Sequence, residues 1–477
     1  FDRKGEVVSM ASEEFTQIYP KPGWVEHDPK EIWEKQVRVA KEAIAKAGIE
    51  ASDLAAIGIT NQRETTVIWD RASGDPIHNA IVWQDRRTAG ACDAMRERGI
   101  EPYVNQNTGL VVDAYFSGTK IEWLLDNVDG ARDRAEAGEL AFGTIDSWLI
   151  WNLTGGAAHV TDVTNASRTL LFNIHDVDWD EKLLGEMRVP REVLPDVRNT
   201  SEVYGETVAG LFDASIPVAS AVGDQQAALF GHACFEQGMA KCSYGTAAAL
   251  MMNTGGTFSP PGEGLISTIA VSIDDEVQYA VEGVLFICGA AVQWLRDELK
   301  LIEKSEDAVC TVDDTNGVYF VPAFTGTSAP TWDAYARGAI VGLTRGANRE
   351  HLIRATLESM AYQVHDVVRA VHSVSGFPLA SLKVDGGATE NDFVMQFQSD
   401  ISNIPVLRPT VTAATARGAA FLAGLATGVW KDRAELADSF ELERQFEPKM
   451  SRADAEKLYA GWQKATERAL DWAEHED

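Results

Sequence analysis

The chain has 477 residues, of which 45% are hydrophobic, and its 42 basic and 72 acidic side chains give a formal net charge of −30. A chain longer than about 300 residues exceeds what one hydrophobic core supports, so we expect two domains. No apolar run approaches the roughly 20 residues that cross a membrane, and so negative a surface repels nucleic acids and anionic lipids. We therefore expect neither membrane insertion nor a nucleic-acid partner.

The acidic residues are spread along the chain instead of being gathered in a tail. A uniformly acidic surface favours solubility in concentrated salt, where mutual repulsion is screened, so we expect a halophilic protein. The five cysteines show no CxxC spacing, which makes a reducing cytoplasm without disulfides or zinc the simplest interpretation. They are Cys92, Cys234, Cys242, Cys288 and Cys310.

Segments with strand and helix patterns alternate from end to end, which predicts an α/β fold. The predicted helices are Pro29–Ala47, Ala114–Asn127, Ala290–Lys300, Arg349–Val374 and Ala453–Glu474. The predicted strands are Ala55–Thr60, Thr65–Trp69, Ile216–Val222, Gly238–Tyr244, Ala248–Asn253, Gly317–Pro322 and Leu382–Val384. Because a strand pair restarts the pattern after residue 232, we predict two domains, 1–232 and 233–477.

Polar and aromatic residues in the first half fit a small polyol. Arg63 and Glu64 follow a predicted strand, and they could hydrogen-bond adjacent hydroxyl groups as donor and acceptor. Trp83 could lie against a carbon chain, and Tyr115 could donate a further hydrogen bond. The competing structural interpretations are a surface ion pair for Arg63 and Glu64 and core packing for Trp83. Taken alone, these residues favour the structural interpretations.

The most informative segment is Val222–Gly231, between the strand Ile216–Val222 and a helix predicted from Ala227. A carboxylate at such a strand-to-helix turn points into a cleft in many α/β proteins. Asp224 there could remove a proton from a hydroxyl group that Gln225 holds. Aspartate is also a preferred helix N-cap, and the segment alone supports both interpretations equally.

Three glycine-bearing turns in the second half could bind a nucleotide. Backbone N–H groups at a strand turn, paired glycines before a helix, and a helix start all favour phosphates. Such glycines are also commonly structural, but three of them opposite a hydroxyl-activating carboxylate indicate phosphoryl transfer. The candidate residues are Thr246, Gly289 with Gln293 one turn later, and Gly387 with Asn391.

Long blocks of the chain resemble the glycerol kinases, members of the sugar-kinase family related to hexokinase and actin. The resemblance covers nearly the whole chain. It implies an α/β fold of two ribonuclease-H-like (actin/hexokinase-like) domains with a catalytic cleft between them. The blocks are Gln17–Asp28, Ile57–Thr66, Asn165–Thr169, Gly223–Gly231, Gln293–Glu298, Gly338–Leu343 with Leu357 and Glu358, and Val384–Gly387.

The resemblance also implies an activity, which is ATP-dependent phosphorylation of glycerol to sn-glycerol 3-phosphate with Mg²⁺. It makes Asp224 the base for the glycerol 3-hydroxyl and leaves the metal ligands unassigned. It implies a cytoplasmic homodimer or homotetramer. The implied glycerol ligands are Arg63, Glu64, Tyr115, Asp224 and Gln225, with Trp83 as an apolar wall. The implied ATP/ADP contacts are Thr246, Gly289, Gln293, Gly387 and Asn391.

The chain departs from this family at its start. Phe1–Gly5 has the pattern of a strand end and a turn, with Glu6–Met10 as the next strand. In the family, an Asp-Gln-Gly-Thr-Thr loop that grips the ATP phosphates comes earlier. We therefore expect the chain to lack roughly its first 20 residues, a length that corresponds to a loop and one strand.

Two further departures bear on substrate and regulation. The family usually has Gly-Cys-Phe after Thr246, where this chain has Ala247–Ala249, and Ala249 would enlarge the substrate pocket. A kinase for another small polyol or ketose and a catalytically inactive binding or regulatory protein therefore remain as alternatives. In bacterial members of the family, a loop with a pattern of glycine and arginine binds an allosteric phosphosugar. Val208–Ile216 lacks this pattern, so we do not expect inhibition by fructose bisphosphate.

Overall fold

The structure is a computed structural model that describes residues 1–411 and 413–473. The chain forms two compact units. Unit 1 comprises Phe1–Ala233, Ser267–Tyr279 and Ala413–Ser439, and unit 2 comprises Cys234–Ile266, Ala280–Thr412 and Phe440–Asp477. The first change of unit lies beside the boundary predicted at residues 232 and 233. Two later segments return to unit 1, so a single cut does not describe the division.

A three-stranded sheet in unit 1 has the order β10 (Ser201–Glu206), β11 (Pro217–Gly223) and β2 (Ile57–Asn61). β11 runs antiparallel to β10 and parallel to β2, and Gly223 pairs with Asn61. All of β11 after its first residue is buried, which explains its continuous apolar sequence. Because parallel strands end at the same edge of a sheet, the residues that follow Asn61 and Gly223 leave it side by side.

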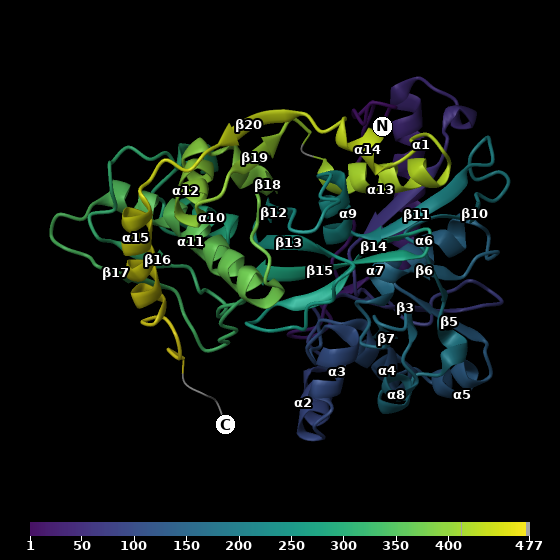
Figure 1. Cartoon of the computed structure of the whole chain (residues 1–477). Coiled ribbons are helices and arrows are strands. Elements are labelled where there is room, and N and C mark those ends of the chain that lie inside the picture. The colour runs from purple at the N-terminus through teal and green to yellow at the C-terminus, as the bar shows by residue number, and fades with distance from the viewer. Residues whose placement is uncertain (412, 474–477) are drawn as a thin grey trace. The chain divides into compact units, whose positions relative to one another are not determined.

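Two helices of unit 1, α9 (Asp224–Gly231) and α13 (Ala414–Ala426), lie against β11 and cross with their backbones in contact (Figure 1). A Cβ atom added at Gly418 would lie 1.9 Å from the carbonyl oxygen of Ala227 and 3.0 Å from the amide nitrogen of Gly231. Only glycine permits so close an approach. Gly418 of α13 therefore allows the backbones of the two helices to touch at Ala227 and Gly231.

Short strands and further helices complete unit 1 around a core that includes Trp69 and Trp148, whose rings meet edge to face at 5.4 Å. The strands pair as β1 (Glu26–His27) with β4 (Ala80–Ile81), β3 (Val67–Asp70) with β5 (Leu140–Gly143), β6 (Val160–Asp162) with β9 (Asp196–Arg198), and β7 (Phe172–Asn173) with β8 (Asp178–Trp179). The helices are α1 (Pro29–Ala47), α2 (Ala89–Glu97), α3 (Glu101–Thr108), α4 (Ser117–Asn127), α5 (Ala131–Glu136), α6 (Ile145–Leu153), α7 (Val163–Ala166), α8 (Glu181–Glu186) and α14 (Arg433–Ala437).

A seven-stranded sheet has the order β14-β15-β13-β12-β18-β19-β20, and most of it belongs to unit 2 (Figure 1). Its centre is parallel, because β12 pairs with β18 and β18 with β19 in the same direction. The strands are β12 (Ala240–Tyr244), β13 (Ala248–Gly255), β14 (Ile266–Ile273), β15 (Glu276–Leu285), β18 (Leu382–Asp385), β19 (Val406–Pro409) and β20 (Leu442–Phe446). The remaining elements of unit 2 are α10 (Gly289–Asp297), α11 (Arg349–Ser375), α12 (Asp392–Ser402), α15 (Arg452–Thr466) and the pair β16 (Tyr319–Val321) and β17 (Ala339–Val341).

Most predicted elements are present, and the differences lie mainly at their ends. Helix α1 has the predicted bounds because Asp28 caps its start and Gly48, with φ of 68°, ends it. Helix α9 begins at Asp224, earlier than the predicted Ala227. The strand predicted at Glu6–Met10 is wrong, since none of the described residues pairs with it. A strand requires a partner for its backbone groups.

Helix α15 ends at Thr466, before the predicted end at Glu474, and Glu474 itself lies outside the described residues. Across 1–411 and 413–473, no helix is both long and apolar enough to span a bilayer.

Candidate active site

The end of β2 and the end of β11 bring two predicted glycerol ligands together. The Nε atom of Arg63 lies 3.1 Å from Oδ1 of Asp224. The Arg63 side chain is only 3% exposed, whereas that of Asp224 is 38% exposed. Arg63 also donates from Nη1 to Oε1 of Gln226 at 3.1 Å. The guanidinium is therefore a buried, held donor beside a carboxylate that remains open to solvent.

Gly223 makes this arrangement possible. A Cβ atom at that position would lie 2.7 Å from Cδ of Arg63 and 2.9 Å from Oε1 of Gln226. Gly223, and not Asp224, is the N-cap residue of α9. The Asp224 carboxylate instead accepts from the amide of Gln225 at 2.8 Å, within the first turn. The capping interpretation of Asp224 is therefore wrong.

A buried hydrogen-bond network supports the backbone at this turn. The amide of Gly223 donates to Oγ1 of Thr164 at 2.9 Å, and that hydroxyl donates to Oδ1 of Asp162 at 2.9 Å. Burial raises the pKa of Asp162 to about 7, and the neighbouring Asp146 carboxyl acts in the same direction. The turn that carries Asp224 is thus hydrogen-bonded to the buried side chains of Thr164 and Asp162, which stabilise its conformation.

Glu64 is buried, with its side chain 2% exposed, so it does not form the surface ion pair considered from the sequence. Its Oε1 lies 2.6 Å from Nε of Arg168 and 3.8 Å from Nε of Arg63. Burial raises the pKa of Glu64 above its usual range, while the nearby Arg168 and Arg63 guanidinium groups oppose that shift. The residue has φ of 56°, and its carbonyl accepts from Ser117 Oγ at 2.9 Å.

The two aromatic candidates contact each other. The rings of Trp83 and Tyr115 meet edge to face at 5.5 Å, and both side chains are half-buried, so Trp83 is not a fully buried core residue. The guanidinium of Arg168 lies over the Tyr115 ring at 5.8 Å. Arg168 therefore links Glu64 to Tyr115 in unit 1.

The sequence interpretation missed Arg168 and Gln226. The first stands in the Asn165–Thr169 block, and the second follows Gln225 directly. The Asn165–Thr169 block was noted for its resemblance to the glycerol kinases, and Gln226 as part of the Val222–Gly231 segment. Neither spacing nor residue type distinguishes a side chain that orients another site residue from one that contacts the substrate.

The predicted nucleotide residues of unit 2 lie at turns that share backbone contacts. Thr246 stands between β12 and β13, and its carbonyl accepts from the amides of Cys288 at 2.9 Å and Ala290 at 3.1 Å. The amide of Gly289 donates to the carbonyl of Gly245 at 2.9 Å, and a Cβ atom at Gly289 would lie 2.7 Å from that oxygen. The turn after β12 and the start of α10 therefore form one backbone assembly, which exposes Gln293 on the helix.

The turn after β18 meets the same assembly. Gly386 has φ of 92°, and a Cβ atom there would lie 2.4 Å from the carbonyl oxygen of Tyr244. Gly387 is exposed, with open space where a side chain would stand. Asn391 caps α12 by accepting from the amides of Phe393 and Val394, and it donates to the carbonyl of Ala308 at 3.0 Å. Asn391 thus has a clear structural role in addition to its predicted one.

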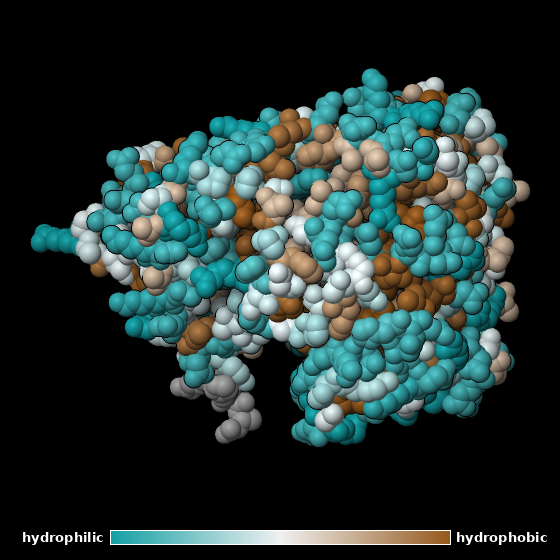
Figure 2. All heavy atoms as spheres, in the orientation of Figure 1, coloured by the Kyte–Doolittle hydropathy of each residue, from teal (hydrophilic) through white to brown (hydrophobic). Residues whose placement is uncertain are grey.

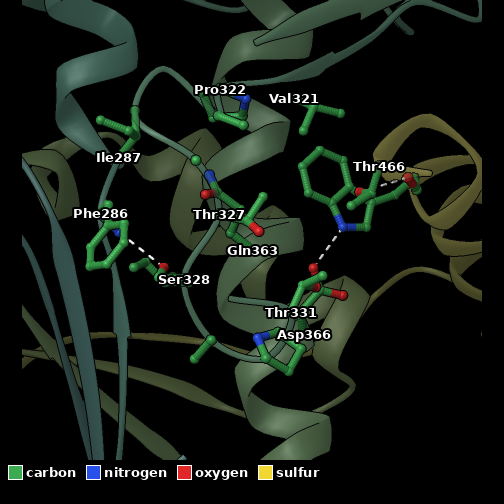
Figure 3. A pocket seen from close by; sticks show the side chains of 16 residues that line it. Phe286, Ile287, Val321, Pro322, Thr327, Ser328, Thr331, Gln363, Asp366 and Thr466 are labelled. Atoms are coloured by element: carbon green, nitrogen blue, oxygen red, sulfur yellow. Dashed lines mark hydrogen bonds between the residues drawn. The ribbon is translucent and has the colours of Figure 1, made fainter. Parts of the chain in front are cut away.

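A separate pocket of about 450 Å³, which includes space open to solvent, lies in unit 2 between the end of β15, the loop after β16, α11 and α15 (Figure 3). Asp366 faces it and accepts from Tyr459 Oη at 2.7 Å and Trp462 Nε1 at 2.8 Å. Figure 3 shows Thr327 and Gln363 near its centre. None of the predicted nucleotide residues lines this pocket.

In the part of the chain that the structure describes, no group of three or more His, Cys, Asp or Glu side chains is placed to hold a metal ion. Mg²⁺ commonly uses only one or two carboxylates together with phosphates and water.

Comparison with known proteins gives full-length similarities. Residues 1–231 match the N-terminal domain of the FGGY family of carbohydrate kinases, and residues 240–427 match its C-terminal domain. The glycerol kinase of Caldanaerobacter subterraneus subsp. tengcongensis is 60% identical over 477 residues, which are 99% of this chain and 96% of that protein. A glycerol kinase of Clostridium botulinum is 58% identical over 479 residues, covering 100% and 96%.

Solved structures agree with these similarities. Plasmodium falciparum glycerol kinase with ADP superposes with a TM-score of 0.91 at 37% identity, covering 96% of this chain and 92% of that one. A ligand-bound xylulose kinase from Lactobacillus acidophilus gives 0.86 at 22% identity, covering 98% and 93%, and so shares the fold. The predicted sugar-kinase fold and the resemblance to glycerol kinases are confirmed.

Proposed function

The chain belongs to the FGGY family of carbohydrate kinases, and we propose that it catalyses the ATP-dependent phosphorylation of glycerol to sn-glycerol 3-phosphate. The observation that carries this proposal is the half-exposed Asp224 carboxylate beside the buried Arg63 guanidinium. Identities of 60% and 58% to glycerol kinases over the full length support glycerol as the substrate. The alternatives, a kinase for another small polyol or ketose and a catalytically inactive relative, are not favoured.

In this mechanism Asp224 is the general base. It accepts the proton of the glycerol 3-hydroxyl while that oxygen bonds to the γ-phosphorus of ATP, and the bond from the γ-phosphorus to the bridging oxygen breaks to release ADP. Arg63 donates to, and Glu64 accepts from, the other hydroxyl groups. Tyr115 and Gln225 add hydrogen bonds, and Trp83 covers the carbon chain.

The nucleotide is assigned to the turns of unit 2, at Thr246, Gly289, Gln293, Gly387 and Asn391. Exposed Gly387 and the backbone assembly at Gly289 suit close approach of phosphate or sugar groups. Mg²⁺ fits the proposal, since the open Asp224 carboxylate offers the oxygen ligand it prefers. When bound, it neutralises phosphate charge.

A direct assay tests the proposed function. The protein is purified together with any residues that precede Phe1 in its gene. It is incubated with ATP, Mg²⁺ and either glycerol, xylulose or gluconate, and both ADP release and the phosphorylated product are measured. We expect turnover with glycerol and formation of sn-glycerol 3-phosphate. Turnover confined to a ketose or sugar acid, or none with any of the three, would contradict the proposal.

Substituting Arg63 by alanine is expected to raise the KM for glycerol about 10- to 150-fold, because buried hydrogen bonds from a charged donor are worth about 1.5–3 kcal/mol. The control is Arg98→Ala, which removes a surface guanidinium 2.6 Å from Glu186 and 52% exposed. Steady-state kinetics with varied glycerol give the KM of each variant. An Arg63→Ala enzyme with the glycerol KM of Arg98→Ala would remove Arg63 from the binding site.

We also propose a cytoplasmic homodimer or homotetramer and adaptation to high salt. The net charge of −30 supports the last of these. Figure 2 shows hydrophilic residues over much of one face, with hydrophobic residues among them. Sedimentation of the purified protein tests the oligomeric state, and a monomer at all concentrations would contradict it.

The salt hypothesis predicts that the melting temperature rises between about 0.1 M and 1 M KCl, as the Debye length falls from about 10 Å to 3 Å and the carboxylates repel one another less. Sorbitol at matched osmolality is the control, since it stabilises through exclusion and leaves charges unscreened. Equal melting temperatures in low and high KCl would contradict the hypothesis.

A further inference from the structure

A fully buried lysine holds the segment that carries Tyr115. Lys120 stands in the first turns of α4, and its side chain has no exposed surface. Its Nζ donates to three consecutive carbonyl groups, those of Ala114 at 2.6 Å, Tyr115 at 2.7 Å and Phe116 at 3.0 Å. An ammonium group has three N–H donors, so donors and acceptors match in number.

Other contacts also shape the segment, including the edge-to-face contact of the Tyr115 and Phe116 rings at 5.1 Å. The amide of Tyr115 donates to Oδ1 of Asp113 at 2.8 Å, and the amide of Phe116 donates to the carbonyl of Asp113 at 3.3 Å. Three consecutive carbonyl dipoles that point at one place repel each other, and each would be costly to bury without a donor. The positive charge of Lys120 therefore stabilises the backbone conformation in which the carbonyl groups of Ala114, Tyr115 and Phe116 point at its Nζ atom.

The side chain that this segment presents belongs to the candidate site. The Tyr115 ring meets Trp83 at 5.5 Å and lies under the Arg168 guanidinium, which is bonded to Glu64. A change in the backbone of Ala114–Phe116 would move the Tyr115 ring relative to both neighbours. Lys120 bonds the carbonyl group of Tyr115 itself, so it holds the residue that carries the ring without an intermediate residue.

We propose that Lys120 is a positioning residue for glycerol binding, which fixes Tyr115 through three carbonyl groups only while it carries its full set of protons. This inference rests on the proposed function, because it concerns a residue assigned there to glycerol. Lys120 itself touches neither substrate nor nucleotide in this proposal.

The surroundings of Lys120 favour loss of its proton within the pH range in which the enzyme can be assayed. Burial lowers the pKa of Lys120 to about 8, against the opposing effect of nearby acidic groups. Those groups are Glu64, Asp85, Asp113 and the Cys92 thiol. Each carboxylate also has an arginine partner, since Arg168 binds Glu64 at 2.6 Å, Arg87 binds Asp85 at 2.8 Å and Arg86 binds Asp113 at 2.6 Å. Among the residues that the structure describes, no carboxylate therefore forms an ion pair with Lys120.

The sign of the pH dependence follows from the donor count. Below a pH of about 8 the ammonium group bonds all three carbonyls. Above it, the neutral amine keeps two N–H donors and turns a lone pair toward the third carbonyl. We therefore expect the KM for glycerol to rise as the pH increases through about 8, while the KM for ATP stays constant.

The experiment compares wild type, Lys120→Met and the surface control Lys182→Met, using the full chain. Values of kcat, glycerol KM and ATP KM are measured between about pH 6.5 and 9.5, a range that brackets a titration shifted down from the usual lysine pKa. In wild type, the glycerol KM should rise about fivefold or more from pH 7 to 9. Lys120→Met should raise it about 10-fold at pH 7, remove its pH dependence and leave the ATP KM within about twofold, since only glycerol contacts Tyr115.

Several outcomes would overturn the inference. A wild-type glycerol KM that stays constant across this pH range would contradict the proposed effect of Lys120 deprotonation. This measurement does not depend on the folding of any variant. A folded Lys120→Met enzyme with wild-type glycerol KM would remove the positioning role, as would equal rises in the KM values for glycerol and ATP. Wild type that does not phosphorylate glycerol at pH 7 would overturn the proposed function, and this inference with it.

Discussion

Replacing Asp224 with asparagine is expected to lower kcat for glycerol by about 10²- to 10⁴-fold while changing the glycerol KM little, because only proton acceptance is removed. Asparagine has the same shape, and its amide oxygen can still accept from Arg63, which lies 3.1 Å from Asp224. The buried guanidinium therefore keeps an acceptor, and the amide of Gln225, which donates to Oδ1 at 2.8 Å, keeps one too.

The measurement is steady-state kinetics of the Asp224→Asn enzyme with glycerol and ATP varied in turn. Asp93→Asn serves as the matched control, since that carboxylate is 65% exposed and pairs with Arg96 in the same helix. The control should keep wild-type kcat. Near-wild-type turnover in Asp224→Asn would show that another group accepts the proton and would leave Asp224 a binding role at most.

Replacing Gly418 with alanine is expected to destabilise unit 1 by about 3 kcal/mol or more, at the upper end of what overpacking costs. The added Cβ atom would lie 1.9 Å from the carbonyl oxygen of Ala227, and backbone atoms cannot rotate away as a side chain can. Helices α9 and α13 must therefore separate. Because Asp224 is the first residue of α9, kcat should also fall in any protein that remains folded.

Urea denaturation followed by circular dichroism measures this effect. Gly185→Ala in α8 is the control, because no atom of a neighbouring residue lies within 4 Å of its added Cβ, and alanine is the better helix former by about 1 kcal/mol. The control should be as stable as wild type or more so. Equal stability of the two variants would mean that the α9–α13 crossing is looser than the structure describes.

Local rules predicted much of this fold from the sequence. Helix α1 has its predicted bounds because its cap residues act within one turn of the chain. The strand pattern located β2 and β11 within two residues, and their parallel pairing then places Arg63 next to Asp224. Arg63 and Asp224 each follow the end of a strand, and a strand end can be found from the local sequence alone.

Long-range contacts account for what the sequence did not predict. Arg168 and Lys120 look like ordinary surface residues by type, and only their burial identifies them as interior charges. The alanines and glycines of α13 gave no strong periodic pattern, although they contact α9 more than 180 residues earlier, as the bond from Arg417 to the Gly231 carbonyl shows. The Glu6–Met10 segment has strand-forming residues but no partner among those described.

The order in which unit 1 takes its parts from the chain has a consequence for biosynthesis. Its last segment, Ala413–Ser439, includes the helix that closes over β2, β11 and α9. A ribosome adds about 5–20 residues per second, and domains usually fold as they emerge. Here the amino-terminal unit must wait, with the apolar faces of its sheet uncovered, until the first two of the three segments of unit 2 have been translated. Nascent chains stalled before residue 413 should therefore engage chaperones, and protease resistance of unit 1 should first appear once Ser439 has left the exit tunnel.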